Sequence, residues 1–274
     1  MLTVVTTYRD NFDLMELMVK YYTKYWKSNQ LIFCIGLDKT PKKEIVEQLS
    51  KLDPTIPENS FKKGEYEWYS GKLIDAVFYQ HTPFNTAQEW NNKRNKLISM
   101  VAPFVKNKNT ALIDNDEFIY CPNPEKALKS GPINLHYCEF VPRETFSMEQ
   151  DWTFTNQAYY YRAIIKGQKD VEHNWCVLWS PGAYIKNGHV GDGNKCQSIT
   201  HEDDWETLKN KNIVFHFGTL SRDFYKERKY WSQGTEQNTI NRFMRDEELN
   251  KLFDEQHLNC PYPTHVCNWL KSFL

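Results

Sequence analysis

The sequence lacks any long apolar run. No stretch of its 274 residues approaches the ~20 consecutive apolar residues that a membrane-spanning helix needs. The start of the chain has no basic segment followed by an apolar one, so the sequence predicts no signal peptide. We therefore expect a cytoplasmic protein with no transmembrane segment, one that reaches a membrane only by contact with its surface.

An excess of charge of one sign is missing too. The sequence has 34 Lys and Arg residues against 35 Asp and Glu residues, which gives a formal net charge of −1. A mainly electrostatic hold on nucleic acid needs a concentrated positive field. The balance of charge therefore argues against a nucleic-acid partner.

A disulfide framework is the third missing feature. The cysteines number seven, which is odd, and they are scattered along the chain. The sequence is 40% hydrophobic and 15% aromatic, enough to bury a sizeable core without disulfide bonds. Reduced, buried thiols are the simpler interpretation.

What the sequence does contain is an alternation of strand-like and helix-like segments. Strands are predicted at Leu2–Thr7 and Leu31–Leu37, with a helix at Phe12–Lys27 between them. A second helix is predicted to open at Thr40-Pro41. The polar segment Asp53–Trp68 is rich in lysine and proline, so it is predicted to be a loop.

The alternation continues to the middle of the chain. A helix is predicted from Thr86 to about Phe104, and a strand at Thr110–Ile113. Asn123-Pro124 has the residues of a helix start, and Gly131 stops that helix. This order predicts an α/β fold with a mostly parallel central sheet flanked by helices.

The second half is less regular, and no repeat or linker divides the chain, so a single domain is expected. The elements predicted there are strands at Ile133–Val141, Asn174–Trp179 and Ile213–Phe217, a loop at Gly182–Asn194, and C-terminal helices from Ser221 and from about Thr235.

The acidic run Asp114-Asn115-Asp116-Glu117 directly follows the apolar strand Thr110–Ile113. Side chains two apart in an extended chain point to the same side, and ligands bind beyond the carboxyl ends of parallel strands. Two carboxylates there suit Mg²⁺ or Mn²⁺, whose other positions go to water and phosphate. The alternative interpretation is an ordinary turn, because Asp and Asn are common turn residues.

This run resembles the D-x-D region of GT-A-fold glycosyltransferases, and with Phe118 it resembles the D-x-D-E-F run of family-92-like and family-2-like enzymes. Residues 2–10 resemble the first strand and nucleotide-contacting turn of that family. The other similar segments, within residues 2–232, are Lys93-Arg94-Asn95-Lys96, Trp179-Ser-Pro, Asn187-Gly-His189 and His216-Phe-Gly-Thr-Leu-Ser221.

The resemblance implies a GT-A-like (Rossmann-like) glycosyltransferase domain. Such an enzyme uses Mn²⁺ or Mg²⁺ to transfer a sugar from a nucleotide-diphosphate donor, a UDP- or GDP-sugar, to a glycan or other hydroxyl acceptor. Residues 1–120 would form the donor half and residues 121–232 the acceptor half, followed by a C-terminal helical segment at 233–274.

The resemblance also implies roles in binding the donor. Thr6, Tyr8 and Arg9 would line the pocket for base and ribose. Asp38 would contact base or ribose, and Arg94 would approach the diphosphate or the first aspartate of the motif. Each position has a plain alternative: Tyr8 and Arg9 as loop residues, Asp38 as a helix cap, and Arg94 as a solvated helix residue.

The metal site implied by the resemblance contains three residues. Asp114 would bind ribose or metal, Asp116 would be a metal ligand, and His216 stands where a late histidine completes the metal site in many GT-A enzymes. His216 lies in an apolar strand, so a hydrogen-bonded core histidine is an equal alternative.

A catalytic base is needed if the enzyme inverts the anomeric centre, to take the proton of the acceptor hydroxyl. Asp203 and Asp204 resemble the late acidic pair of inverting family-2-like enzymes. Asp203 also has capping-box spacing with a glutamate three residues on, and this cap is the stronger interpretation. Asp192 and Glu139 are further candidates, and a retaining enzyme would need no such base.

Two rival functions remain open. A phosphohydrolase with an aspartate nucleophile also carries D-x-D after an apolar strand, but it expects Thr or Val where this chain has Phe118. A sugar-nucleotide-binding protein without catalysis is the second rival.

Overall fold

The structure is a computed structural model of the 274-residue chain. It describes residues 1–8, 12–37, 40–56, 60–80, 97, 100–107, 109–130, 136–140, 154–156, 163–166, 174–177, 210, 212–217 and 272. The elements in chain order are β1 (Leu2–Tyr8), α1 (Phe12–Lys24), β2 (Gln30–Leu37), α2 (Lys42–Leu52), β3 (Ser60–Lys63), β4 (Tyr66–Ser70), β5 (Ile74–Gln80), a 3-10 turn (Ala102–Phe104), β6 (Asn109–Asp114), β7 (Glu117–Tyr120), α4 (Pro124–Ser130), β8 (His136–Phe140), β9 (Phe154–Asn156), β10 (Ala163–Lys166), β11 (Asn174–Val177) and β12 (Ile213–His216).

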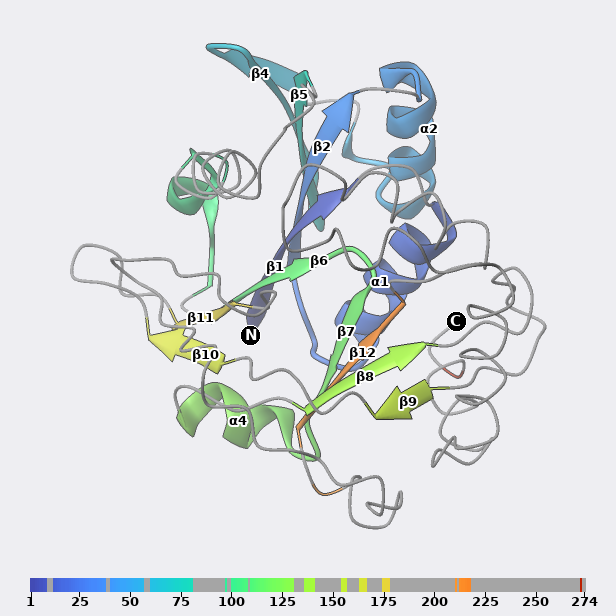
Figure 1. The fold of residues 1–274 in the computed structure, drawn as a ribbon. Helices are drawn as coiled ribbons and strands as arrows, with labels where there is room; N and C mark the ends of the chain where they lie inside the picture. Colours follow the sequence, from blue (N-terminus) through green and yellow to red (C-terminus); the bar gives the residue numbers. More distant parts are fainter. Residues whose placement is uncertain are drawn as a thin grey trace, which may run out of the picture.

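A large mixed sheet forms the centre of the described structure, with strand order β10-β11-β6-β1-β2-β5-β4-β3. The five inner strands, from β11 to β5, are parallel to their neighbours, whereas β10, β4 and β3 pair antiparallel at the two edges. The expected α/β fold with a mostly parallel central sheet is thereby confirmed (Figure 1).

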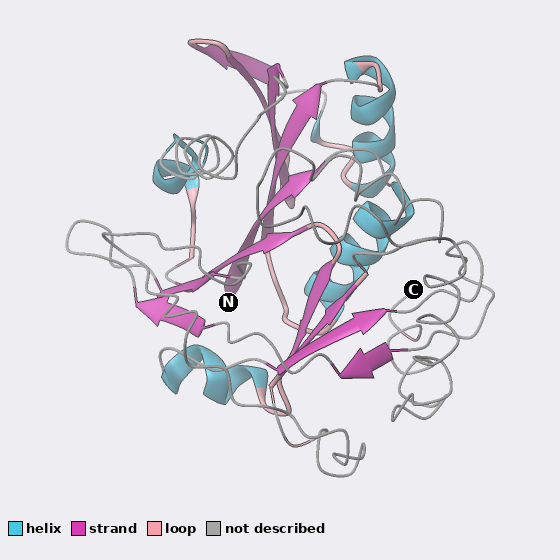
Figure 2. Cartoon of the chain, in the orientation of Figure 1, coloured by secondary structure: helices cyan, strands magenta, loops and turns pink. Residues whose placement is uncertain are grey.

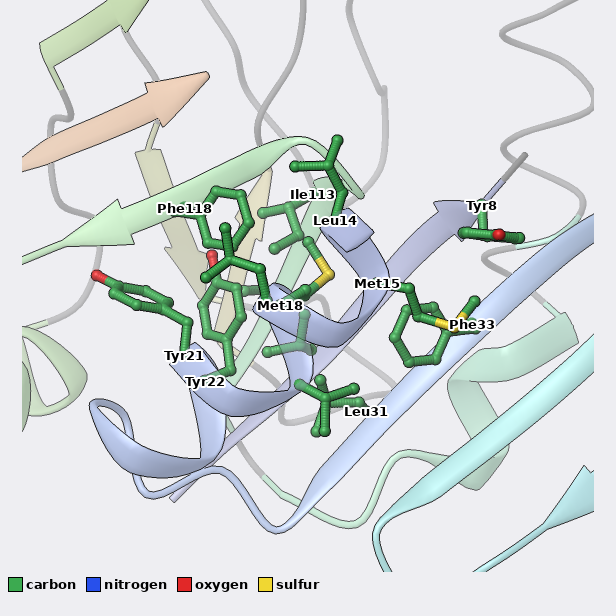
Figure 3. Close-up of a cluster of buried hydrophobic side chains, with 14 of the residues drawn as sticks. Tyr8, Leu14, Met15, Met18, Tyr21, Tyr22, Leu31, Phe33, Ile113 and Phe118 are labelled. Atoms are coloured by element: carbon green, nitrogen blue, oxygen red, sulfur yellow. The ribbon is translucent and has the colours of Figure 1, made fainter. Parts of the chain in front are cut away.

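Helices cover both faces of this sheet (Figure 1 and Figure 2). On one face, Leu14 and Met18 of α1 and Leu49 of α2 share a buried cluster with Leu31 and other residues of β1 and β2 (Figure 3). On the other face, a second buried cluster joins strand residues to the helical residues 97 and 101. Strands buried on both faces carry near-continuous apolar runs, which is why β1 and β2 are recognisable in the sequence.

A second, smaller sheet has the order β7-β12-β8-β9. Its strand β12 pairs antiparallel with β7 and parallel with β8. The chain leaves the large sheet at the end of β6 and enters the small sheet at the start of β7, and only a turn at Asn115 and Asp116 separates the two strands. The acidic run therefore lies where the two sheets join (Figure 1).

The prediction of a loop at Asp53–Trp68 is wrong for its second part. Strands β3 and β4 form an antiparallel hairpin there, with Gly64 at a positive φ of 62° in the turn. The segment is polar because β3 is an edge strand: Lys62 is exposed and Phe61 is 42% exposed. Edge strands commonly carry lysine, which discourages pairing with another chain.

Other predicted boundaries agree closely with the structure. Helix α1 ends at Lys24, three residues earlier than predicted. The predicted cap at Asn123 is confirmed, because its Oδ1 accepts a hydrogen bond from the Lys126 N–H at 2.9 Å. The strands predicted in the second half contain β8, β11 and β12. The predicted loop at 182–194 and the two C-terminal helices lie outside the described residues.

Two cysteines are described with their side chains. Neither Cys34 nor Cys121 forms a disulfide bond, and both are buried. Burial raises the pKa of the Cys121 thiol far above its usual value, so this thiol stays protonated and unreactive at neutral pH. Both fit the expected reduced, buried thiols.

Candidate functional site

Asp114 occupies the carboxyl end of β6, beside β1. The parallel register pairs Asp114 with Thr7. The strand order reverses here, since β1 is followed on one side by β2 and on the other by β6, which comes much later in the chain. Ligands of open α/β sheets bind in the crevice outside the carboxyl ends of strands at such a switch point. The fold therefore places the first aspartate of the motif at the position where a ligand is expected.

Two hydrogen bonds fix Asp114. The Thr7 hydroxyl donates to Asp114 Oδ1 at 3.2 Å, and the Asp114 N–H donates to Glu117 Oε2 at 3.0 Å. Thr7 and Asp114 are 107 residues apart in the sequence, so the first bond depends on the pairing of β1 with β6. The Asp114 side chain is half-buried.

Asp116 lies in the turn that follows. Residues 115 and 116 are not extended, so the alternation of side chains along a strand covers Asp114 but stops short of Asp116. Asp116 is half-buried with its Oδ1 shielded from solvent, and its carbonyl oxygen accepts the Phe217 N–H at 2.7 Å. The acidic run is thus a turn, as the plain interpretation predicted, and it sits at the edge where a ligand is expected.

The third predicted metal ligand, His216, is brought to the same turn by its backbone. It is the last residue of β12, and the antiparallel register places it opposite Glu117. The hydrogen bond from Phe217 to Asp116 continues that pairing into the turn. The described positions of Asp114, Asp116 and His216 therefore meet at one junction, although they come from two sheets. Metal binding by the histidine stays a prediction.

The two β1 residues predicted to line the donor pocket lie in the core instead of beside the acidic turn. Thr6 and Tyr8 are buried; the Thr6 hydroxyl donates to the Thr7 carbonyl at 3.3 Å, and the Tyr8 ring packs near Phe12 with centroids 5.9 Å apart. Because side chains alternate along a strand, their neighbour Thr7 faces the other way and contacts Asp114. Sequence reasoning missed Thr7, since only the register identifies it.

Among the other candidates, Glu139 lies in β8, opposite His216. Five predicted site residues lie outside the described part of the chain. They are Arg9, Asp38, Arg94, Asp203 and Asp204. Their roles in donor binding and proton transfer stay predictions.

Glu117 is a second residue that sequence reasoning missed. It is 0% exposed, and besides the bond to Asp114 its carbonyl oxygen accepts the Tyr22 hydroxyl at 3.1 Å. Buried acidic residues are rare unless they are paired or hydrogen-bonded. The available signal was a third acidic residue at the start of an apolar run, Phe118-Ile119, which marks a strand that opens with a buried carboxyl group.

Aromatic side chains of α1 and of the turn after it hold β7 in place beside the acidic turn. Tyr21 and the Trp26 indole both donate to the Ile119 carbonyl at 2.7 Å, and the Ile119 N–H donates to the Tyr22 hydroxyl at 3.0 Å. Burial, followed by the neighbouring Tyr25 and Tyr22, raises the pKa of Tyr21 well above its ordinary value. The hydroxyl group of Tyr21 therefore remains a neutral donor, and the strand after the acidic turn is tied to the helix.

The donor chemistry of this turn fits a hard divalent cation. Mg²⁺ is typically held by one or two carboxylates, with water and substrate phosphates in its other positions. Asp114 and Asp116 supply two such carboxylates at the junction. Among the side chains that the structure describes, no group of three or more His, Cys, Asp and Glu residues could hold a metal ion by itself.

No protein-family model matches the chain, and no curated protein matches it. Within the described residues, no helix is long and apolar enough to cross a membrane.

Proposed function

We propose that this protein is a metal-dependent glycosyltransferase that moves a sugar from a nucleotide-diphosphate donor to a hydroxyl acceptor. The observation that carries the proposal is the position of Asp114: it ends a buried parallel strand at the point where the strand order reverses, with Asp116 in the turn that follows. The resemblance of this run to the D-x-D region of GT-A enzymes supports the same conclusion.

In this proposal Asp114 and Asp116 hold the cation, Mn²⁺ or Mg²⁺, and His216 completes the site. When bound, the cation stabilises the negative charge that develops on the departing diphosphate. Thr7 orients the Asp114 carboxylate, and the pairing of β12 with β7 keeps His216 beside the turn. Arg9, Asp38 and Arg94 form the donor side.

The acceptor side belongs to residues 121–232 in this proposal. Asp203 and Asp204 are its candidates for the base of an inverting reaction, because a carboxylate near the acceptor hydroxyl can take its proton. The acceptor is a glycan or another hydroxyl compound.

Asp116→Asn tests the site directly. The change keeps the size of the side chain and the backbone bond to Phe217, but it removes the charge that holds the cation. We expect Mn²⁺-dependent hydrolysis or transfer of UDP- or GDP-sugars to fall by at least about 100-fold, since even residues behind the metal ligands commonly contribute 10- to 100-fold. The matched control is Glu125→Gln, which changes an exposed carboxyl on a different element, α4, and should keep full activity.

A thermal-shift screen identifies the donor. UDP-, GDP-, CMP- and dTDP-sugars are each added with and without Mn²⁺, and a ligand at 100 times its Kd should stabilise the fold by about 2.7 kcal/mol. Stabilisation by one nucleotide class that requires Mn²⁺ and is absent in Asp116→Asn supports the proposal. Full activity of Asp116→Asn contradicts the site, and release of phosphate from simple phosphoesters without sugar transfer would favour a phosphohydrolase.

A further inference from the structure

Glu117 is a buried acidic residue in a place where the fold does not require one. It opens β7 with 0% exposure, directly before Phe118, which is buried among Tyr21, Tyr22 and Phe217. A carboxyl group at such a position is costly unless a hydrogen bond compensates it. Core packing alone therefore does not explain an acidic side chain at this position.

Glu117 is linked to Asp114 by a hydrogen bond, to Asp116 by the chain and to His216 by strand pairing. Its Oε2 accepts the N–H of Asp114 across the turn at 3.0 Å, and Asp116 is its neighbour in the chain. Its register partner on β12 is His216. Glu117 thus connects all three residues that we assign to the cation.

Glu117 is itself held rigidly. The Tyr22 hydroxyl donates to its carbonyl oxygen at 3.1 Å and accepts the Ile119 N–H at 3.0 Å, so α1 fixes the first residues of β7. On the other side of the turn, Thr7 donates to Asp114 Oδ1. Asp114 is therefore fixed at its backbone by Glu117 and at its carboxylate by Thr7.

We propose that Glu117 is a positioning residue: its carboxyl oxygen, by accepting the Asp114 N–H, holds the acidic turn in the shape that binds the divalent cation. The inference rests on the proposed function, because it deepens the same site. Residues behind metal ligands orient them and typically change metal affinity by 10- to 100-fold when removed. The role depends on the length of the Glu117 side chain, because its carboxyl oxygen must contact the N–H of Asp114, three residues earlier in the chain.

Three variants distinguish the effect of side-chain length from the effect of the negative charge at position 117. Glu117→Gln keeps an acceptor oxygen at the same distance and loses the acid; Glu117→Asp keeps the acid and shortens the side chain by one carbon; Glu117→Ala removes both. Binding of Mn²⁺ alone is measured by electron paramagnetic resonance, in which the free ion gives the signal. We expect the affinity to fall by about 10- to 100-fold in Glu117→Ala and Glu117→Asp, and to stay within about fivefold in Glu117→Gln.

Tyr21→Phe is the matched control for loss of stability. It removes a buried hydrogen bond to β7, at the Ile119 carbonyl, but it touches no residue of the acidic turn. This variant should melt earlier and bind Mn²⁺ with unchanged affinity. If Glu117→Ala does not fold, the Mn²⁺ affinities of the Gln and Asp variants still test the positioning role, because both variants keep a polar side chain of similar size.

The outcomes distinguish this inference from the function on which it rests. Unchanged Mn²⁺ affinity in Glu117→Asp and Glu117→Ala overturns the positioning role, as does a loss in Glu117→Gln with retention in Glu117→Asp, which would indicate that the charge matters. If Mn²⁺ binds in the expected order and no nucleotide-sugar is turned over, the positioning role stands and the transferase proposal fails. If the unmodified chain binds no Mn²⁺, both are overturned.

Discussion

A single carboxylate, that of Asp53, organises the chain between α2 and β5. It is buried and accepts hydrogen bonds from the Thr55 hydroxyl at 2.6 Å and from the N–H groups of Leu73 and Ile74 at 2.7 and 2.9 Å. Gly71 allows this close approach, because a Cβ atom there would lie 2.4 Å from Asp53 Oδ2. The Asp53 carboxylate thereby accepts hydrogen bonds from backbone N–H groups in place of backbone carbonyl oxygens.

Acid should weaken the fold through this residue. Burial raises the pKa of the Asp53 carboxyl, but the hydrogen bonds from Thr55, Ile74 and Leu73 together outweigh burial, so the pKa lies below its usual value. A depressed pKa contributes stability that is present above the unfolded-state pKa of about 3.9 and is lost as the pH falls through the folded-state value.

Asp53→Asn tests this linkage. We expect the free energy of unfolding at pH 7 to fall by about 1.5–3 kcal/mol, because hydrogen bonds to a charged acceptor are replaced by neutral ones. The difference between variant and unmodified chain should shrink as the pH is lowered from 5 to 3, measured by urea denaturation. Glu47→Gln, an exposed change on α2, is the control and should leave both stability and its pH dependence nearly unchanged. A difference that stays constant with pH would contradict the assignment.

At the scale of elements, α1 does more than cover the sheet. Strand β7 is an edge strand of the small sheet, with β12 on one side only. On its other side, aromatic residues of α1 and of the turn that follows it donate hydrogen bonds to its backbone. Tyr21 and Trp26 donate to the Ile119 carbonyl, and Tyr25 donates to the Cys121 carbonyl just beyond the strand. Edge strands carry unpaired backbone groups that natural proteins must cover. The helix and the turn after it cover this edge and tie β7 to the core.

Tyr22→Phe removes the hydroxyl that bonds both the Glu117 carbonyl and the Ile119 N–H. The packing of the ring is kept, so the loss reflects two buried backbone groups that lose their partner. We expect the free energy of unfolding to fall by about 1–3 kcal/mol, measured by urea denaturation. Tyr69→Phe, whose half-buried hydroxyl donates to Glu67, is the control and should cost less. Equal losses of unfolding free energy in the two variants would show that the hydrogen bonds to β7 stabilise the fold no more than the bond between Tyr69 and Glu67.

At the scale of the whole molecule, one amide side chain ties the amino-terminal end of the large sheet together. Gln30 opens β2; its Nε2 donates to Asp75 Oδ2 at 2.6 Å and to the Phe104 carbonyl at 2.9 Å, and its Oε1 accepts the Thr3 hydroxyl at 3.0 Å and the Lys106 N–H at 2.8 Å. Strands β1, β2 and β5 and the segment that leads into β6 therefore meet at this residue. The site lies at the opposite, carboxyl end of the neighbouring strands β1 and β6.

Gln30→Met keeps the approximate volume but leaves those donors and acceptors unsatisfied in a buried place. We expect the free energy of unfolding to fall by about 2–4 kcal/mol, with a matching decrease in Tm. The circular dichroism spectrum should show that the sheet is preserved. Gln48→Met on the surface of α2 is the control and should have a small effect. A Tm for Gln30→Met equal to that of the control would contradict a central role for this network.

Most central strands could be predicted from the sequence, whereas several edge strands could not. The strands β1 and β2 are apolar throughout because they are buried on both faces, and the α4 start is marked by the residue type at Asn123. The strands β3 and β7 escaped prediction. The first is a polar edge strand, and the second has four residues and opens with an acidic one, so neither has an apolar pattern long enough to predict a strand. Strand β5 was also not predicted from the sequence.

The sequence by itself determined the acidic turn, since Asp114 and Asp116 follow a buried apolar strand whatever surrounds them. Only the tertiary structure decided what touches that turn. Thr7 reaches Asp114 through the β1–β6 register, His216 arrives through the pairing of β12 with β7, and Glu117 is buried because α1 covers its strand. The physical reason is that hydrophobic patterns report burial, which is a local property, whereas strand register is a relation between distant segments that no local pattern records.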